Sequence, residues 1–291
     1  MIKVSVIIPT CNRRHTLGRA LRSVLSQQDV VFEVLVVDDG STDGTAEWLE
    51  KEFPSVVCLR QNNAGPAAAR NTGIRSARGP WLAFLDSDDV WESGKLAAQL
   101  AFFRENPQYR ICQTEEIWIR NGKLVYPMNK HRKSGGHIFE RCLELCLISP
   151  SAVMMHRDLM DESGLFDESY PACEDYELWL RITAREPVGL IETPYVIKYG
   201  GNTDQRSREF PAMDRFRIRA MLKTLRSGLL NESQRLALLT ELEAKTGVLI
   251  QGALKRGKEE EASALRALVT AARQNGIADE SVLESCFSVG R

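Results

Sequence analysis

The sequence has no apolar run that approaches the roughly 18 residues of a membrane-spanning helix. Its first residues, Met1-Ile2-Lys3, lead directly into a strand-like segment and lack the apolar stretch of a signal peptide. These two absences predict a cytoplasmic protein. The 38 Lys and Arg residues are balanced by 39 Asp and Glu residues, so no basic surface predicts a nucleic-acid partner.

The sequence also lacks the histidine-based and glycine-rich motifs of several common enzyme classes. The four histidines do not cluster, so neither a histidine-based metal centre nor a serine-hydrolase triad is supported, and no G-x-S-x-G elbow occurs. The sequence has no G-x-G-x-x-G fingerprint and no Walker loop, which argues against dinucleotide and P-loop ATP chemistry. The seven cysteines are scattered and odd in number, which predicts a reducing compartment rather than a disulfide framework.

In the first hundred residues, strand-like segments alternate with helix-like segments. Short apolar runs typical of strands occur at 4–8, 34–37, 56–59 and 81–85. Segments with helical spacing lie between and after them, at about 17–25, 45–52, 66–77 and 96–103. Continuous apolar strands that alternate with amphipathic helices predict an α/β fold with a mainly parallel sheet covered on both faces.

The rest of the chain is less regular and then becomes helical. Between 109 and 200 we expect strands at 110–119, 151–155 and 188–199, and a helix over 174–185. Beyond residue 201 the pattern is helical, and the glycines at 228, 257 and 276 divide it into three or four helices.

Polar residues follow each of the first four predicted strands. These strand ends are Pro9-Thr10, Asp38-Asp39-Gly40, Gln61-Asn62-Asn63 and Asp86-Ser87-Asp88-Asp89. The carboxyl ends of parallel strands share one edge, and open α/β sheets bind ligands in the crevice beyond that edge. We therefore expect the two acidic clusters to meet in one cleft.

The cluster from Asp86 to Asp89 is the strongest of these signals. Three carboxylates within four residues repel one another unless a positive charge lies among them. Mg²⁺ or Mn²⁺ on a diphosphate is the natural partner of such oxygen ligands. A helix start capped by Asp89 and Glu92 is the alternative, but it leaves Asp86 and Asp88 unexplained.

Three further elements each have a structural alternative. The segment 38–44 could bind a base N–H through an Asp, or it could be a polar turn. The segment 63–73 could bring Arg70 to a phosphate, or it could be an alanine-rich packing helix with a solvated Arg. Glu174 and Asp175 could include a general base, or they could be first-turn acids stabilised by the helix dipole.

Together, these segments resemble the family 2 glycosyltransferases in order and spacing. The resemblance rests on 4–13, 36–45, 63–73 and 84–89, with Glu174-Asp175 similar to the family's acidic dyad, and it covers about residues 1–200. It implies a GT-A fold, which is a Rossmann-like mixed sheet with mainly parallel strands. It also implies a catalytic domain over 1–205, divided into a nucleotide-binding half (1–105) and an acceptor half (106–205), followed by a helical C-terminal extension over 206–291.

The resemblance further implies a metal-dependent hexosyltransferase with a nucleoside-diphosphate-sugar donor, with UDP as the expected nucleotide. Transfer to an acceptor hydroxyl would proceed with inversion, in the synthesis of cell-surface polysaccharide or glycoconjugate. By the same resemblance, Asp39 binds the base, Asp88 and Asp89 hold Mn²⁺ or Mg²⁺, and Asp175 is the catalytic base beside Glu174. The implied donor contacts are Pro9, Thr10, Cys11, Asn12, Asp39, Arg70, Asp86 and Asp88.

Two departures from the family pattern stand out. Asn202 lies where many relatives carry a His, which bears on how the metal–diphosphate site is completed. The Trp motif and the membrane helices of processive synthases are missing, which favours a single-addition enzyme.

Several alternatives remain open from the sequence. A sugar nucleotidyltransferase would also need a nucleotide cleft and a metal, and a non-catalytic module could retain the cleft. The acceptor is expected to be a saccharide or a lipid-linked molecule. The basic, amphipathic segment 206–230 predicts either peripheral contact with the inner face of a membrane or a helix packed on the catalytic domain with a solvated basic face.

Overall fold

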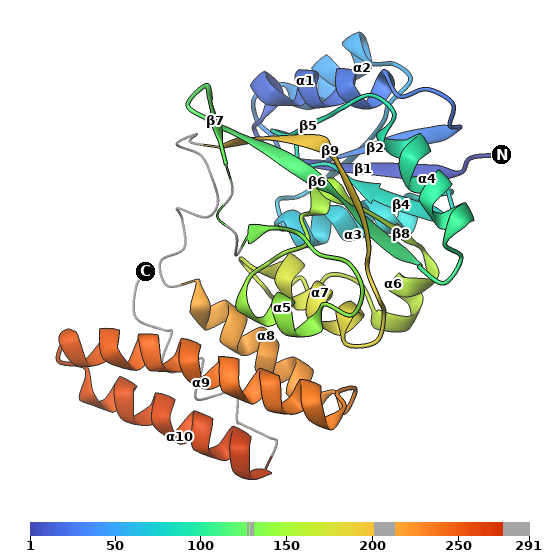
Figure 1. Ribbon diagram of the computed structural model, residues 1–291. Helices are drawn as coiled ribbons and strands as arrows, with labels where there is room; N and C mark the ends of the chain where they lie inside the picture. Colours follow the sequence, from blue (N-terminus) through green and yellow to red (C-terminus); the bar gives the residue numbers. More distant parts are fainter. Residues whose placement is uncertain (127, 129–130, 201–212, 276–291) are drawn as a thin grey trace.

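The computed structural model describes residues 1–126, 128, 131–200 and 213–275 (Figure 1). The strands of its central sheet are β1 (Val4–Thr10), β2 (Phe32–Asp39), β3 (Val57–Gln61), β4 (Trp81–Phe84), β5 (Val90–Trp91), β6 (Ile111–Arg120), β7 (Lys123–Val125), β8 (Val153–His156) and β9 (Gly189–Gly200). The α-helices are α1 (Arg14–Leu25), α2 (Thr45–Glu52), α3 (Pro66–Ser76), α4 (Lys95–Glu105), α5 (Phe139–Glu144), α6 (Asp158–Ser163), α7 (Glu174–Thr183), α8 (Asp214–Arg226), α9 (Glu232–Lys255) and α10 (Glu259–Asn275). The strands expected from apolar runs are all present, within a few residues at each end.

The sheet has the order β3-β2-β1-β4-β8-β6-β9-β5, and β7 pairs with β6. Strands β3, β2, β1 and β4 are parallel to one another, as the alternating pattern predicts. In the second half the sheet is mixed, because β8 runs antiparallel to both β4 and β6 while β6 and β9 are parallel. The α/β fold with a mixed sheet is confirmed, and the carboxyl ends of β1, β2 and β4 meet at one edge.

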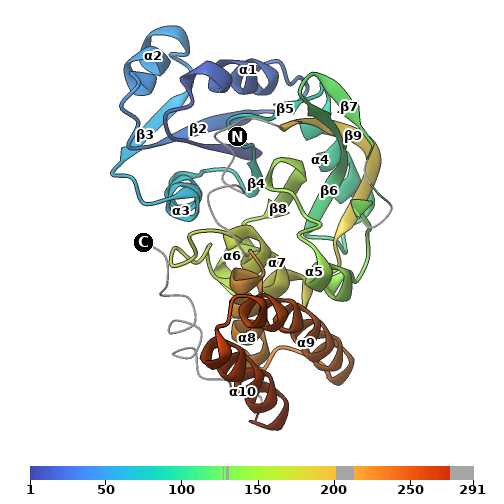
Figure 2. The same cartoon turned by 90° about the vertical axis from the view of Figure 1, so that its left-hand side faces the viewer.

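Two apolar cores cover the faces of the sheet. Val6 and Ile8 of β1 pack with Leu21 of α1 on one face, and all three side chains are fully buried. Ile7 points to the other face, where it packs in one cluster with Ile74 of α3. Helices α1 and α2 lie on the side of the sheet opposite to α3 (Figure 2). Each fully buried aliphatic side chain of this kind contributes roughly 1.5–3 kcal/mol to stability.

A glycine allows α3 to lie close to the sheet. A Cβ atom at Gly73 would lie 2.4 Å from Cγ2 of Ile7, which is closer than any real contact of this kind. This close approach sets the position of α3 on the sheet. The N-terminus of α3 follows β3 and lies near the carboxyl edge of the sheet.

The last three described helices, α8, α9 and α10, lie below the rest of the molecule (Figure 1). Helix α8 packs on α7, and its Ile218, Met221 and Leu222 are at most 1% exposed in the same core as Trp179 of α7. The apolar stripe of the basic segment is thus buried within the protein. No described helix combines the length and apolar character that a membrane crossing requires.

The basic side chains of α8 also contact the protein. Lys223 Nζ lies 2.6 Å from Asp167 Oδ2, and Arg219 donates to the backbone oxygen of Ser169 at 3.2 Å. These contacts agree with the interpretation of α8 as a packed helix and give no support to membrane contact by this segment. The predicted boundary between 205 and 206, residues 206–212 of the segment and the residue at 202 lie outside the described residues.

Candidate active site

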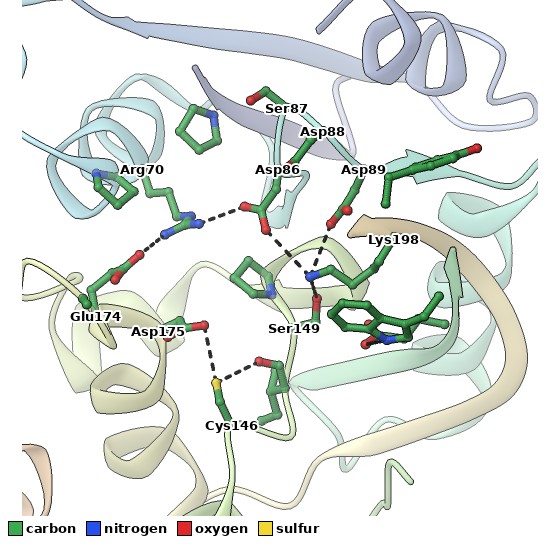
Figure 3. A pocket seen from close by; sticks show the side chains of 18 of the residues that line it. Arg70, Asp86, Ser87, Asp88, Asp89, Cys146, Ser149, Glu174, Asp175 and Lys198 are labelled. Atoms are coloured by element: carbon green, nitrogen blue, oxygen red, sulfur yellow. Dashed lines mark hydrogen bonds and ion pairs between the residues drawn. The ribbon is translucent and has the colours of Figure 1, made fainter. Parts of the chain in front are cut away.

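A cavity of about 1010 Å³ opens at the carboxyl edge of the sheet. It is lined from both halves of the predicted catalytic domain, by strand ends on one side and by the start of α7 on the other (Figure 3). Every residue that we selected from the sequence lines it: Pro9, Thr10, Cys11, Asn12, Asp39, Arg70, Asp86, Asp88, Asp89, Glu174 and Asp175. The prediction that the two acidic clusters meet in one cleft is confirmed.

Asp39 is fixed at the end of β2 by three donors. Its Oδ1 accepts hydrogen bonds from Gln61 Nε2 at 2.7 Å and from the Ala64 N–H at 2.9 Å, and its Oδ2 accepts one from the Gly65 N–H at 2.8 Å. The residue is 4% exposed. A carboxylate has about four acceptor positions, so one position on Oδ2 is not taken by these donors.

The loop after β1 is tied to the loop after β2. The N–H of Asn12 donates to Ser41 Oγ at 2.9 Å, and Asn12 Oδ1 accepts from the Thr42 N–H at 2.8 Å. Asn12 has a φ of 53°, a left-handed conformation that Asn tolerates better than most residues. These contacts fix the wall of the cavity that includes Cys11 and Asn12.

Arg70 bridges the two halves of the site. Its Nη1 donates to Glu174 Oε1 at 2.8 Å and its Nη2 to Asp86 Oδ1 at 2.9 Å (Figure 3). Arg70 is 5% exposed, so the helix does not carry the solvated Arg of the structural alternative. Burial raises the pKa of Glu174, and the neighbouring Arg70 opposes this rise.

The acidic loop after β4 is neutralised by cations from two other elements. Lys198 of β9 lies 3.3 Å from Asp89 Oδ2 and 3.9 Å from Asp86 Oδ2 (Figure 3). Arg13 Nη1 lies 2.6 Å from Asp88 Oδ2. Asp89 also accepts a hydrogen bond from Ser151 Oγ at 2.6 Å and is 2% exposed.

The carboxylates of the loop respond differently to these surroundings. Burial is the main reason that the pKa of Asp89 is raised to about 7; Lys198 opposes the rise, and the nearby charges of Asp86 and Asp88 add to it. The pKa of Asp86 is lowered instead, because the charges of Arg70 and Lys198 outweigh the effect of its burial.

The second acidic pair lies at the start of α7. Asp175 Oδ1 accepts the Tyr176 N–H at 2.7 Å, and the thiol of Cys146 donates to Asp175 Oδ2 at 3.4 Å. Glu174 is 8% exposed and engaged with Arg70, whereas Asp175 is only partly buried. Both acids line the cavity, and Asp175 is the more exposed of the two.

Several cavity residues were not identified from the sequence. Lys198, Cys146 and Trp118 stand in segments without a motif, and only the fold brings them to the site. Arg13 lies three residues beyond the end of β1, so its position beside Asp88 could have been anticipated from the shared sheet edge.

A cavity of this kind, lined by carboxylates beyond the carboxyl ends of parallel strands, is typical of α/β enzymes that bind nucleotides. Residues 5–164 of the 291 match the family model described as Glycosyl transferase family 2. The chain belongs to this family, as the resemblance of its motifs implies.

Curated relatives agree with this assignment. The chain is 37% identical over 193 residues to an uncharacterized glycosyltransferase of Rickettsia conorii, in a match that covers 65% of this chain and 32% of that protein. The match thus spans about a third of that relative's length. The chain is also 32% identical over 198 residues to WfgD of Escherichia coli, in a match that covers 66% of this chain and 74% of WfgD. WfgD is named a UDP-Glc:alpha-D-GlcNAc-diphosphoundecaprenol beta-1,3-glucosyltransferase.

Solved structures of S. aureus TarS have a similar fold. The complex of TarS with UDP superimposes with a TM-score of 0.72 at 20% identity, covering 98% of this chain and 86% of the TarS chain. The complex with UDP-GlcNAc gives 0.70 at 21% identity, covering 99% of this chain and 91% of that one. This likeness confirms the GT-A type of fold that the sequence motifs imply.

Proposed function

We propose that this glycosyltransferase moves a sugar from a UDP-sugar to a hydroxyl group of a saccharide or lipid-linked acceptor, with inversion at the anomeric carbon. The observation that supports it most is that Asp39, Asp88 and Asp175, from three separate elements, line one cavity. The substrates after which WfgD is named and the UDP and UDP-GlcNAc bound in the TarS structures support the same donor class.

The nucleotide half of the proposed site is built around Asp39. The one acceptor position of its carboxylate that is not engaged by Gln61, Ala64 or Gly65 is suited to the ring N–H of uracil. The loop formed by Pro9 to Asn12 would contact the nucleoside. Because three donors already fix the carboxylate, it is oriented before the nucleotide binds, which lowers the entropic cost of binding.

The acidic loop suits a metal ion that is shared with a diphosphate. Among the described residues, no three His, Cys, Asp or Glu side chains form a ready-made metal cage. Mg²⁺ bound to nucleotides commonly takes only one or two carboxylates and completes its shell with phosphate oxygens and water. Asp88 lines the cavity, 16% of its side chain is exposed, and only its Oδ2 is paired with Arg13, so it fits this role, with Asp89 beside it. When bound there, Mn²⁺ or Mg²⁺ would supply charge stabilisation to the leaving diphosphate.

The proposed reaction is a single displacement. The acceptor oxygen attacks the anomeric carbon as the bond from that carbon to the diphosphate oxygen breaks, and Asp175 takes the hydroxyl proton. Asp175 is suited to this part because its carboxylate faces the cavity, while Arg70 holds the neighbouring Glu174. Arg70 and Lys198 would hold Asp86 in place on the donor side.

The test is a thermal-shift and turnover screen of nucleoside diphosphates and UDP-sugars, each with and without Mn²⁺. We expect UDP-sugars to raise the melting temperature with Mn²⁺ present, and UDP to be released when an acceptor is added. Release of pyrophosphate from UTP and a sugar 1-phosphate would instead indicate a nucleotidyltransferase. Tight binding of UDP-sugars with no turnover on any acceptor or water would indicate a non-catalytic module.

A further inference from the structure

The hairpin of β6 and β7 exposes an unusual number of apolar side chains. Three consecutive residues, Leu124, Val125 and Tyr126, are 53%, 37% and 82% exposed, and Met128 is 60% exposed. The hairpin lies at the margin of the molecule, beyond the body of the sheet (Figure 1). Exposed apolar side chains that cluster in this way mark a binding surface more often than isolated ones do.

Strand pairing divides these side chains between two faces. Trp118 of β6 lies opposite Val125 of β7, and Ile119 lies opposite Leu124. Since side chains alternate along a strand, Trp118 and Val125 share one face and Leu124 points to the other. Trp118, Val125 and Tyr126 line the catalytic cavity, whereas Leu124 does not. The apolar face is therefore continuous with the site that holds Asp175.

Positive charge accompanies this face. Arg120 lines the cavity mouth and is exposed, and it forms no ion pair within the described part of the chain. Lys123 lies directly opposite Arg120 in the β6–β7 register and is also exposed. His131 lines the same cavity. The exposed apolar side chains thus lie beside two exposed cationic side chains, Arg120 and Lys123.

We propose that this hairpin face, formed by Trp118, Arg120, Val125 and Tyr126, docks an acceptor whose saccharide is joined through a diphosphate to a long lipid in a bilayer. The diphosphate would pair with Arg120, and the first part of the lipid chain would cover Val125 and Tyr126. The saccharide would then extend into the cavity toward Asp175. The inference rests on the proposed transfer reaction and narrows its acceptor to the lipid-linked class.

The positive charges of the hairpin disfavour a second copy of this chain as the partner that binds this face. Pairing two hairpins edge to edge would bring Arg120 and Lys123 of each copy close to like charges, which is unfavourable at short range. An amphiphile with an anionic group next to its apolar chain complements both features of the surface. Tyr126 suits a bilayer surface in particular, because tyrosine is enriched where the apolar membrane core meets the headgroups.

The experiment is co-sedimentation with neutral phosphatidylcholine vesicles, either plain or containing undecaprenyl diphosphate. We expect the full chain to bind the vesicles that contain the lipid diphosphate in clear preference to plain ones. The double variant Val125→Ser, Tyr126→Ser should bind them about tenfold more weakly, since two apolar side chains lose their burial. Arg120→Gln should reduce binding to the level seen with plain vesicles.

Leu124→Ser is the control, because it removes an exposed apolar side chain from the other face of the same strand. We expect it to bind like the unaltered chain. Equal loss with Leu124→Ser, equal binding to plain vesicles, or no vesicle binding would each overturn the proposal. Calorimetry with UDP on the same samples tests the proposed transfer reaction separately from the docking surface. If the unaltered chain does not bind UDP, the result counts against the transfer reaction and leaves the docking surface untouched.

Discussion

Arg70 and Glu174, 104 positions apart in the sequence, are joined by a hydrogen bond of 2.8 Å between Nη1 and Oε1. The other terminal nitrogen of the same guanidinium binds Asp86 at 2.9 Å. One buried cation thus links the loop after β4, where the donor is proposed to bind, to the first turn of α7, where the proposed base lies. The link fixes the two chemical groups of the site relative to each other.

Removal of this guanidinium should cost much stability. In Arg70→Met, Glu174 and Asp86 lose their shared cation while Glu174 stays buried, and removing one partner of a buried pair costs about 3–5 kcal/mol. Urea denaturation followed by circular dichroism measures this loss. Arg75→Met on the same helix is the control, because the Arg75–Glu168 pair is 3.5 Å long and about half exposed, and such pairs contribute about 0–1 kcal/mol. Similar losses in both variants would contradict the bridging role.

Asp175→Asn should abolish transfer and leave donor binding nearly intact. The amide cannot accept the acceptor's proton, and loss of a general base lowers kcat by about 10²–10⁴-fold. Initial rates with a UDP-sugar and an active acceptor measure the effect, and calorimetry with UDP measures binding. Asp161→Asn, an exposed acid on α6 outside the cavity lining, should behave like the unaltered enzyme. Full turnover by Asp175→Asn would refute the assignment of the base.

Sequence patterns located the strand ends that line the cavity well, for a physical reason. Continuous apolar strands end abruptly in polar residues, so Asp39 and Asp86 identify the sheet edge without knowledge of the tertiary structure. Lys198 could not be found in this way. It reaches Asp86 and Asp89 only because β9 pairs with β6 across the mixed half of the sheet, and nothing local in the sequence encodes that pairing.

The C-terminal segment shows the same limit of local patterns. An apolar stripe beneath basic residues is compatible with a bilayer or with a protein surface, since both bury apolar area. The packing of Ile218 and Met221 of α8 into the core of α7 distinguishes the two, and it depends on contacts between elements. The exposed hairpin of Val125 and Tyr126 escaped notice because its three-residue strand is too short to show a period.

Asp39→Asn should weaken the binding of UDP about 10- to 100-fold, because the amide has only one acceptor oxygen and the protein's own N–H groups compete for it. Calorimetric titration with UDP measures this change. Asp38→Asn is the neighbouring control: Asp38 is equally buried, accepts the Ser41 N–H at 2.9 Å, and does not line the cavity. Unchanged UDP affinity in Asp39→Asn would exclude Asp39 as the residue that binds the base.

Lys95 gives the stability a pH dependence of known sign. Burial lowers the pKa of its amine to about 7, from 10.5, while Gln99 Oε1 lies 2.7 Å from Nζ and the ring of Trp91 lies 4.2 Å away. Between pH 7 and the ordinary value, the unfolded chain holds a proton that the folded chain has released. The free energy of unfolding therefore contains a contribution from Lys95 that rises with pH across this window, by at most about 1.4 kcal/mol per unit.

Urea denaturation at pH 7, 8 and 9 tests this. The unaltered chain should gain stability relative to Lys95→Met as the pH rises, because Met has no proton to release and its free energy of unfolding lacks this contribution. Lys51→Met removes a lysine whose side chain is 82% exposed, so its stability should run parallel to that of the unaltered chain at all three values. A difference between Lys95→Met and the unaltered chain that stays constant with pH would show that the buried amine keeps its proton when the protein folds. In that case Gln99 and Trp91 would have to offset the free-energy cost of burying the charged amine of Lys95, which is 0% exposed. We expect the opposite result, because one neutral hydrogen bond and one ring contact are too weak to offset that cost.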